Sequence, residues 1–203
     1  MIRNLIFDLG NVLLNWNPEK YLDQAGYTED EKSHILENIF RGKEWRLLDN
    51  GDISIGQAID LISGRSSMKK AEIRAVFDLR LKILHPIKSN TEMLPALKKM
   101  GYKLYFLSNF PEDIFEDIEN GYEFFRNFDG GLISARARSC KPDKKIYELL
   151  LERFSLKPEE CLFADDSIIN VKGAEAVGMH GIHIADPADL QGHIVNITGA
   201  LVN

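Results

Sequence analysis

The chain has 203 residues, of which 44% are apolar and 28% are charged, and its formal net charge is −6. These values are typical of a globular protein with a sizeable core. The acidic balance, without a Lys/Arg stripe, argues against nucleic-acid binding, because contact with a phosphate backbone needs clustered positive charge. No apolar run approaches the ~20 residues of a membrane span and the N-terminus lacks a signal-peptide pattern, so we expect a cytoplasmic protein that binds no membrane.

The only two cysteines are Cys140 and Cys161. In a chain of this size without a secretion signal, incidental thiols are a better interpretation than a disulfide. The five histidines show no spacing typical of a metal site.

Five short apolar runs are expected to form buried strands. Each is nearly continuous rather than alternating, which is typical of strands covered on both faces. They are residues 2–7, 103–107, 131–133, 161–164 and 181–184. Helical patterns at 89–100, 143–154 and 170–177 alternate with the later strands. This alternation predicts an α/β fold, with a Rossmann-like parallel sheet and helices on both of its faces.

Residues 16–85 do not follow this alternation of strands and helices, because they show helical patterns and no strand. The patterns lie near 18–25, 29–41, 54–62 and 69–84. We therefore expect an α/β core domain made of residues 1–15 and 86–203, with a helical-bundle cap domain of residues 16–85 inserted after the first strand. The tail from residue 186 onward is expected to be a short helix and an extension.

Polar side chains follow four of the predicted strands. Ligands of an open parallel sheet sit beyond the carboxyl ends of its strands, so we expect these side chains to share one cleft. They are Asp8, Ser108, Asn109, Lys141, Asp165 and Asp166. Taken singly, each has an ordinary interpretation as a turn residue, a helix cap or loop surface. Their joint occurrence at four strand ends favours a site.

The residue types in this cleft suit phosphoryl transfer. Carboxylates packed together repel one another unless a cation lies between them, and a hard oxygen-rich set of this kind suits Mg²⁺. Lys141 would neutralise a transferred phosphoryl group, and Ser108 would donate its hydroxyl to a phosphate oxygen. Asp8 would attack phosphorus in line and form an aspartyl-phosphate, which divides one difficult step into two.

Four motifs occur in order along the chain: FDLGNVL at 7–13, FLSN at 106–109, CKPDKKIY at 140–147 and FADDSIINVKGAEAVGM at 163–179. With the helical gap after the first, they resemble the haloacid dehalogenase (HAD) superfamily, in its phosphatase branch with a helical (C1-type) cap. The resemblance covers residues 2 to about 184. The FDLGNVL form is similar to that of bacterial phosphatases of the α-D-glucose-1-phosphate type, which implies a sugar phosphate as substrate.

The resemblance implies a role for each matching position. Asp8 would be the nucleophile and a Mg²⁺ ligand, and the backbone carbonyl of Gly10 would be a second ligand. Ser108 and Lys141 would bind the phosphoryl group, and Lys141 would also orient Asp8. The remaining positions are Asp165 as a direct metal ligand, Asp166 as a ligand directly or through water, and Asn109 and Asn170 as supporting residues.

Gly10 departs from the family pattern. Most phosphatases of this superfamily carry an aspartate there, which protonates the leaving group and later activates water. General acid–base help is worth typically ~10²–10⁴-fold, so its loss should slow the enzyme without abolishing turnover. A sugar 1-phosphate would tolerate the loss best, since an anomeric alkoxide leaves more easily. Alternatively, the acid comes from the cap or from the substrate.

Three other functions remain open. A 2-haloacid dehalogenase would use the same aspartate on carbon without a metal, which leaves Asp165 and Asp166 without a purpose. A phosphomutase needs the acid–base group that Gly10 removes, and a non-catalytic phosphate-ester-binding protein has Gly10 as its only support. Trp16 and Trp45 are candidates for substrate contact from the cap, with Arg46 and Asp49 as weaker ones. The sequence leaves both a monomer and a homodimer possible.

Overall fold

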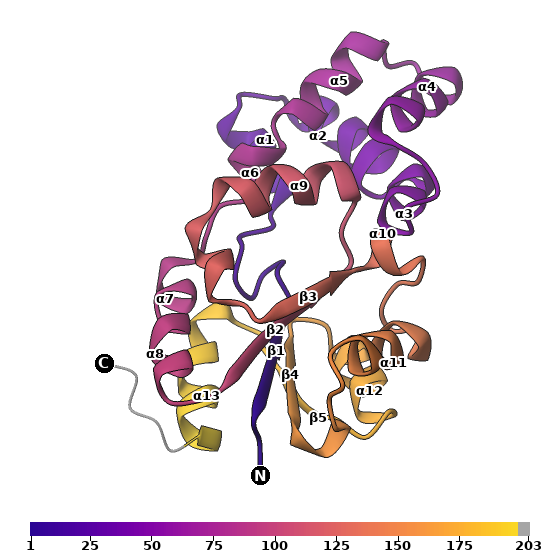
Figure 1. Cartoon of the computed structure of the whole chain (residues 1–203). Helices are drawn as coiled ribbons and strands as arrows, with labels where there is room; N and C mark the ends of the chain where they lie inside the picture. The colour runs from indigo at the N-terminus through magenta and orange to yellow at the C-terminus, as the bar shows by residue number, and fades with distance from the viewer. Residues whose placement is uncertain (199–203) are drawn as a thin grey trace.

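The computed structural model describes residues 1–198, and its centre is a five-stranded sheet (Figure 1). All neighbouring strands are parallel, in the order β3-β2-β1-β4-β5. The strands are β1 (Asn4–Phe7), β2 (Lys103–Ser108), β3 (Gly130–Ile133), β4 (Cys161–Asp165) and β5 (His180–His183). The predicted α/β fold with a Rossmann-like parallel sheet is confirmed.

The register of the sheet brings three strand ends together. Phe7 at the end of β1 lies opposite Phe106 of β2 and Ala164 of β4. Asp8, one residue further on, is therefore level with Asp165, the last residue of β4, and with Leu107, one residue before the end of β2 at Ser108. The central position of β1 thus places Asp8 in the middle of the carboxyl edge of the sheet.

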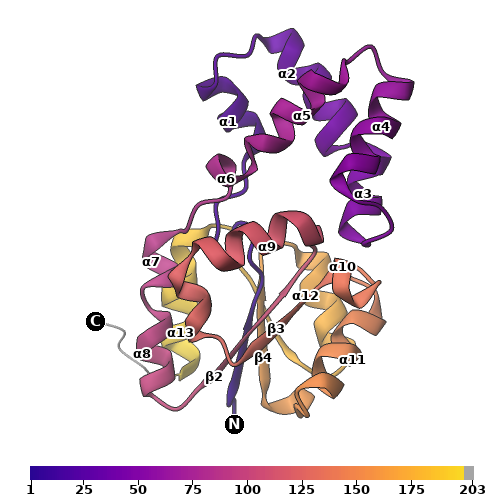
Figure 2. The same cartoon turned by 45° about the horizontal axis from the view of Figure 1, so that its top comes forward.

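Helices cover both faces of the sheet, because successive strand residues point to opposite faces. Leu5 and Phe7 pack on one face, against α8 (Leu94–Lys99), α9 (Glu112–Gly121) and α13 (Leu190–Thr198). Ile6 packs on the other face, against α11 (Lys144–Arg153) and α12 (Ile168–Glu175). Figures 1 and 2 show α8 and α13 on one side of the strands, α11 and α12 on the other, and α9 above the sheet.

Residues 18–83 form a helical insertion between β1 and β2, above the carboxyl edge of the sheet in both views. Its elements are α1 (Pro18–Gln24), α2 (Glu29–Ile35), a π-helix (Leu36–Phe40), α3 (Lys43–Asp49), α4 (Ile55–Arg65), α5 (Lys70–Asp78) and α6 (Arg80–Ile83). Capping boxes at Thr28 and Ser54 start α2 and α4. The insertion has a hydrophobic cluster of its own, built on Ile39, Ile59 and Ile62.

The chain crosses between the core and the insertion twice, and the two crossings lie side by side. An antiparallel bridge pairs Leu14 with Pro86. The Asn15 amide donates to the His85 carbonyl at 2.9 Å, and the Ile87 amide donates to the Leu13 carbonyl at 2.9 Å. The insertion is thus attached to the core by a short two-stranded ribbon.

Several helix boundaries differ from the sequence-based prediction. The helix expected at 89–100 is divided into α7 (Lys88–Thr91) and α8, because Pro95 has no amide hydrogen to continue the α7 ladder. The pattern at 69–84 is likewise divided into α5 and α6, with a turn at Leu79. Three helices were not predicted: α3, α9 and α10 (Ser134–Ala137).

The C-terminal helices and the two cysteines were also predicted from the sequence. The helix expected at 170–177 begins earlier, as α12. α13 supplies the expected terminal helix, and the extension falls at 199–203, outside the described residues. Cys140 and Cys161 are free thiols, as expected. Among residues 1–198, no helix combines the length and the apolar character needed to cross a membrane.

Candidate active site

Asp8 is the central side chain of the site, and it is 7% exposed. Its Oδ1 accepts a hydrogen bond of 2.6 Å from the Ser108 hydroxyl and one of 2.8 Å from the Leu9 amide. The ammonium group of Lys141 lies 2.9 Å from the same oxygen. Three donors from three segments therefore fix the orientation of the Asp8 carboxylate.

Lys141 bridges two carboxylates. Its Nζ also lies 2.6 Å from Oδ2 of Asp165, and both of these side chains are almost fully buried. Asp165 accepts further hydrogen bonds from the Asn170 amide, at 3.0 and 3.2 Å, and from the Ser167 backbone amide at 2.8 Å. The Lys141 backbone is held by a reciprocal pair with the Asn109 side chain, at 3.0 and 2.8 Å. Each polar group in this network therefore positions the next.

The carboxyl groups of Asp8, Asp165 and Asp166 lie around a single ammonium group, that of Lys141. Burial raises the pKa of Asp8 to about 6; Asp165 adds to the rise, and the attraction of Lys141 opposes it. Burial also opposes the charge on Lys141, but Asp8 and Asp165 outweigh it, so the pKa of Lys141 is raised. The pKa of Asp166 is raised too, mainly by burial. A further cation would relieve the repulsion among these carboxylates.

Asp166 is tied to the loop after β1. Its Oδ2 accepts a hydrogen bond of 3.0 Å from the Asn11 amide, and Oδ1 of Asn11 accepts the Trp16 backbone amide at 3.1 Å. Asn11 has a φ of 52°, in the left-handed region that asparagine tolerates better than most residues. Asn11 therefore connects the acidic cluster to the entrance of the helical insertion.

Asp8, Asp165 and Asp166 fit a divalent metal ion. Each offers one carboxylate oxygen, and these atoms lie within 4.8 Å of one another. Carboxylate oxygens at this density are typical Mg²⁺ ligands. The donor set therefore matches the metal predicted from the sequence.

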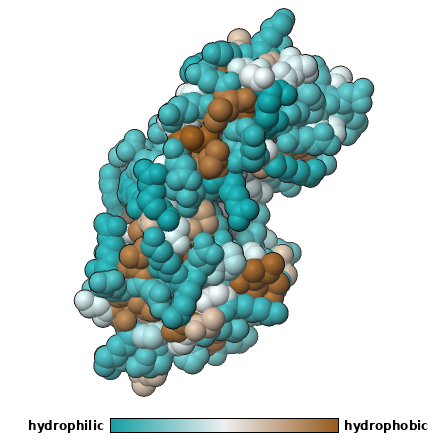
Figure 3. Space-filling model, turned by 90° about the vertical axis from the view of Figure 1, so that its right-hand side faces the viewer, coloured by the Kyte–Doolittle hydropathy of each residue, from teal (hydrophilic) through white to brown (hydrophobic). Residues whose placement is uncertain are grey.

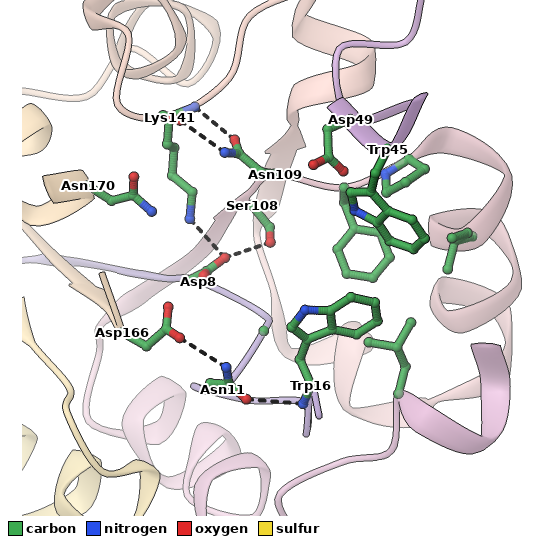
Figure 4. Close-up of a pocket in the computed structure, with 15 residues that line it drawn as sticks. Asp8, Asn11, Trp16, Trp45, Asp49, Ser108, Asn109, Lys141, Asp166 and Asn170 are labelled. Carbon is green, nitrogen blue, oxygen red and sulfur yellow. Dashed lines mark hydrogen bonds and ion pairs between the residues drawn. The ribbon is translucent and has the colours of Figure 1, made fainter. Parts of the chain in front are cut away.

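A cavity opens over Asp8 between the core and the insertion (Figure 4). Figure 3 shows the surface indented on one side, between an upper and a lower lobe of the molecule. Ser108, Lys141 and Asp166 lie on one side, as Figure 4 shows, and Trp16 and Trp45 on the other. Its other apolar lining residues are Leu84, Phe110, Pro111 and Ile114. The cavity thus has a polar floor and a largely apolar wall.

The two tryptophans belong to an aromatic cluster. The Trp16 and Trp45 ring centroids are 5.5 Å apart, and Phe40 lies 5.1 Å from Trp45. Phe77 stacks on Trp45 with an interplanar angle of 5°. The wall of the cavity is therefore the edge of a packed aromatic group.

Asp49, the last residue of α3, also lines the cavity. Its Oδ1 is buried and has no hydrogen-bond partner within the described part of the chain. Burial raises its pKa to about 7, with the repulsion of Asp8 adding to the rise and Lys141 opposing it. Asp49 is thus a carboxyl group poised to change its protonation state near neutral pH.

The structure brings together most of the residues singled out from the sequence. Those that line the cavity are Asp8, Gly10, Trp16, Trp45, Asp49, Ser108, Asn109, Lys141, Asp166 and Asn170. Asp165 lies behind them, fully buried against Lys141. Arg46 is exposed and does not line this cavity. Sequence reasoning missed Asn11, although an asparagine directly after Gly10 was a signal for a left-handed turn.

Comparisons with known proteins agree with this geometry. Residues 2–178 match the haloacid dehalogenase-like hydrolase family. The chain is 31% identical over 181 residues to the sesquiterpene phosphatase astK of Aspergillus oryzae, and the match covers 89% of each protein.

Solved structures share the fold. A predicted HAD-like family hydrolase from Porphyromonas gingivalis superposes with a TM-score of 0.78 at 23% identity, covering 99% of this chain and 100% of the other. A HAD family enzyme of Bacteroides thetaiotaomicron, solved in complex with magnesium and inorganic phosphate, has a TM-score of 0.69 at 24% identity, covering 90% and 94%. This chain belongs to the haloacid dehalogenase-like hydrolase family.

Proposed function

We propose that the protein is a Mg²⁺-dependent phosphatase of small phosphate monoesters, with Asp8 as the nucleophile. The observation that carries the proposal is the position of Asp8. It lies at the carboxyl edge of the sheet, faces the cavity, and is held by Ser108 and Lys141 beside two further carboxylates. A side chain oriented by three donors is prepared for in-line attack.

The first half of the reaction follows from these contacts. A carboxylate oxygen of Asp8 attacks phosphorus, and the bond from phosphorus to the ester oxygen breaks. Lys141 and Ser108 bind phosphoryl oxygens, and Lys141 also keeps Asp8 oriented. The product is an aspartyl-phosphate, which water then hydrolyses to inorganic phosphate and free Asp8.

Four groups would hold Mg²⁺: the carboxylates of Asp8 and Asp165, the backbone carbonyl of Gly10, and Asp166 directly or through water. When bound, the ion offsets negative charge on the phosphoryl oxygens. Asn109 and Asn170 support the site through their contacts with Lys141 and Asp165.

The helical insertion is proposed to act as a cap of the helical (C1) type. The domain division proposed with it is a core of residues 1–15 and 86–203 and a cap of 16–85. Support comes from the separate hydrophobic cluster of the insertion and from two tryptophans that line the cavity, Trp45 of the insertion and Trp16 in the connection that leads into it. Such a cap would exclude water during phosphoryl transfer and select the alcohol part of the substrate.

The apolar wall of the cavity favours a substrate with an apolar alcohol part. Trp16, Trp45 and Ile114 would contact the alcohol part of the ester, and apolar side chains favour an alcohol with an apolar carbon skeleton. The similarity to a sesquiterpene phosphatase supports the same preference. The sugar phosphate suggested by the FDLGNVL motif stays the second candidate, because the polar floor would suit its hydroxyl groups.

The test is a panel of phosphate monoesters with Mg²⁺ that compares p-nitrophenyl phosphate, farnesyl phosphate, a short alkyl phosphate and glucose 1-phosphate. We expect phosphate release, its loss in Asp8→Asn, and higher kcat/KM for the apolar esters. Trp45→Ala should lower kcat/KM for farnesyl phosphate more than for glucose 1-phosphate. No release from any ester would contradict the phosphatase function, and halide release from 2-haloacids in the presence of a chelator would favour a dehalogenase.

A further inference from the structure

The proposed reaction needs an acid for the leaving group and a base for the attacking water, and position 10 supplies neither. Gly10 has no side chain, although it lines the same cavity as Asp8. Most of the titratable side chains that line the cavity already have a polar partner. Asp8 and Lys141 form an ion pair, and Asp166 accepts a hydrogen bond from Asn11.

Asp49 is the remaining titratable side chain among the residues that line this cavity. It enters from α3, and Figure 4 shows its carboxyl group directed toward the space beside Ser108. A buried carboxyl oxygen without a hydrogen-bond partner is costly unless it serves a ligand. An ester oxygen or a water molecule in the cavity would give this oxygen the partner that the described residues do not.

The core holds Asp49 in this position. The Ser134 hydroxyl donates a hydrogen bond of 2.5 Å to the backbone carbonyl oxygen of Asp49. The Ser134 Oγ also accepts a hydrogen bond of 2.9 Å from the Phe110 backbone amide. Gly51, two residues after Asp49, has a φ of +72°, and a Cβ there would come within 2.5 Å of the Ala135 carbonyl oxygen. The backbone beyond α3 therefore fits closely against the core, which fixes the distance between Asp49 and the floor of the cavity.

We propose that Asp49 is the general acid and general base of the phosphatase reaction, in place of the side chain missing at Gly10. This proposal rests on the proposed function. In the first step, protonated Asp49 gives its proton to the ester oxygen while the bond from Asp8 to phosphorus forms and the ester bond breaks. In the second, the Asp49 carboxylate takes a proton from water while the water oxygen bonds to phosphorus and the bond from phosphorus to Asp8 breaks. The products are an alcohol and inorganic phosphate, and Asp49 is protonated again.

The pKa of Asp49, raised to about 7 by burial, agrees with this role. A group that both gives and takes a proton works best when its pKa is near the operating pH. Burial also keeps bulk water away from the carboxyl oxygen, which favours proton exchange with the bound substrate.

The experiment compares Asp49→Asn with wild type on two esters that differ in their leaving group. p-Nitrophenolate leaves without a proton, whereas an alkoxide needs one. We expect kcat/KM for the alkyl phosphate to fall by roughly 100-fold or more, and that for p-nitrophenyl phosphate by less than about ten-fold. With p-nitrophenyl phosphate the variant should release a burst of one p-nitrophenol per enzyme and accumulate phosphorylated Asp8, detected by intact-protein mass.

Asp52→Asn is the matched control, since Asp52 is an exposed carboxylate three residues further on that pairs with Arg138. It should leave both esters unaffected. Asp49→Asn keeps the size of the side chain and removes a buried charge, so thermal unfolding should show a folded protein of equal or greater stability.

Three results would overturn the proposal. If Asp49→Asn retains wild-type turnover on both esters, Asp49 is not the acid or the base, and the phosphatase function stands. If both esters lose activity equally without a burst, Asp49 binds substrate rather than moving protons. If wild type hydrolyses neither ester nor any other in the panel, the proposed function and this proposal fall together.

Discussion

The Ser134 hydroxyl in the core donates a hydrogen bond of 2.5 Å to the backbone carbonyl oxygen of Asp49 in the helical insertion. The same hydroxyl accepts the amide of Phe110, two residues after Ser108. One buried side chain thus links α10, the loop after β2 and the end of α3. The distance between the floor of the cavity and its wall depends on this link.

Ser134→Ala should lower both stability and turnover. It leaves the Asp49 carbonyl and the Phe110 amide without their partner, which costs about 1–3 kcal/mol. Urea unfolding and phosphate release measure the two effects. Ser63→Ala is the control, because the Ser63 hydroxyl on α4 also donates to a backbone carbonyl, that of Asp60 at 3.0 Å, but this hydrogen bond is exposed to solvent. Equal turnover in wild type and Ser134→Ala would show that this link does not position the site.

Lys141→Met should be strongly destabilising at neutral pH. The ammonium group lies between Asp8 and Asp165, and its removal leaves two buried carboxylates facing each other. Breaking a buried ion pair costs about 3–5 kcal/mol, whereas Lys144→Met, at an exposed pair with Glu148, should cost under ~1 kcal/mol. Without Lys141 the pKa of Asp8 rises further, so the deficit should shrink from pH 8 to pH 5. A deficit that stays constant with pH would contradict this account.

Asp49 makes stability depend on pH in a defined direction. Its folded-state pKa is about 7, against an ordinary value of 3.8, so between these values the folded protein holds a proton that the unfolded chain has lost. Stability conferred by that proton is present at low pH and is lost as the pH rises through the window. Asp49→Asn should therefore gain stability relative to wild type by roughly 2–3 kcal/mol between pH 5 and pH 8, measured by urea unfolding without Mg²⁺. A difference that does not change with pH would contradict the raised pKa.

Magnesium should stabilise the folded protein, since its proposed ligands come together only when the sheet forms. At a concentration of 100 times Kd the gain is about 2.7 kcal/mol, seen as a higher Tm. Asp165→Asn should abolish the gain, and Asp49→Asn should retain it, because Asp49 is not part of the acidic cluster. A Tm that does not respond to Mg²⁺ would contradict the proposed metal site.

Gly10→Asp should partly restore an Asp49→Asn variant. Within the described part of the chain, the one atom within 4 Å of a Cβ at Gly10 would be the Cβ of Trp16, at 3.8 Å, so the cavity accepts a side chain there. The new carboxyl group would stand where most phosphatases of the superfamily carry theirs, and kcat for an alkyl phosphate should rise by about 10-fold or more. Gly10→Asn in the same background is the control, and equal activity of the two variants would show that the gain is not acid–base catalysis.

The sheet and its carboxyl edge were predictable because they depend on short-range patterns. Near-continuous apolar runs predicted each strand found among residues 1–198, and the polar residues that follow them made Asp8, Ser108, Lys141 and Asp165 candidates for the site. Parallel pairing then requires these ends to meet, since β1 lies between β2 and β4.

The contribution of the insertion was less predictable. Trp45 and Asp49 belong to α3, a helix of seven residues whose apolar positions face partly its own cluster and partly the core. Such a short helix has no clear periodicity. The position of Asp49 depends on its contact with Ser134 and on the contact of Gly51 with Ala135, both far away in the sequence, which no local pattern encodes.

The insertion is held to the core in two different ways, by the ribbon at Leu14 and Pro86 and by the hydrogen bond from Ser134 to Asp49. Covalent attachment confines the insertion to one edge of the core, whereas at the opposite edge the Ser134 hydrogen bond fastens it reversibly. Movement that widened the cavity for entry of an ester would separate Asp49 from Ser134, and the proposed proton donor would then leave the floor of the cavity. An open enzyme would therefore carry a nucleophile without its acid, and hydrolysis would begin only after the substrate is enclosed.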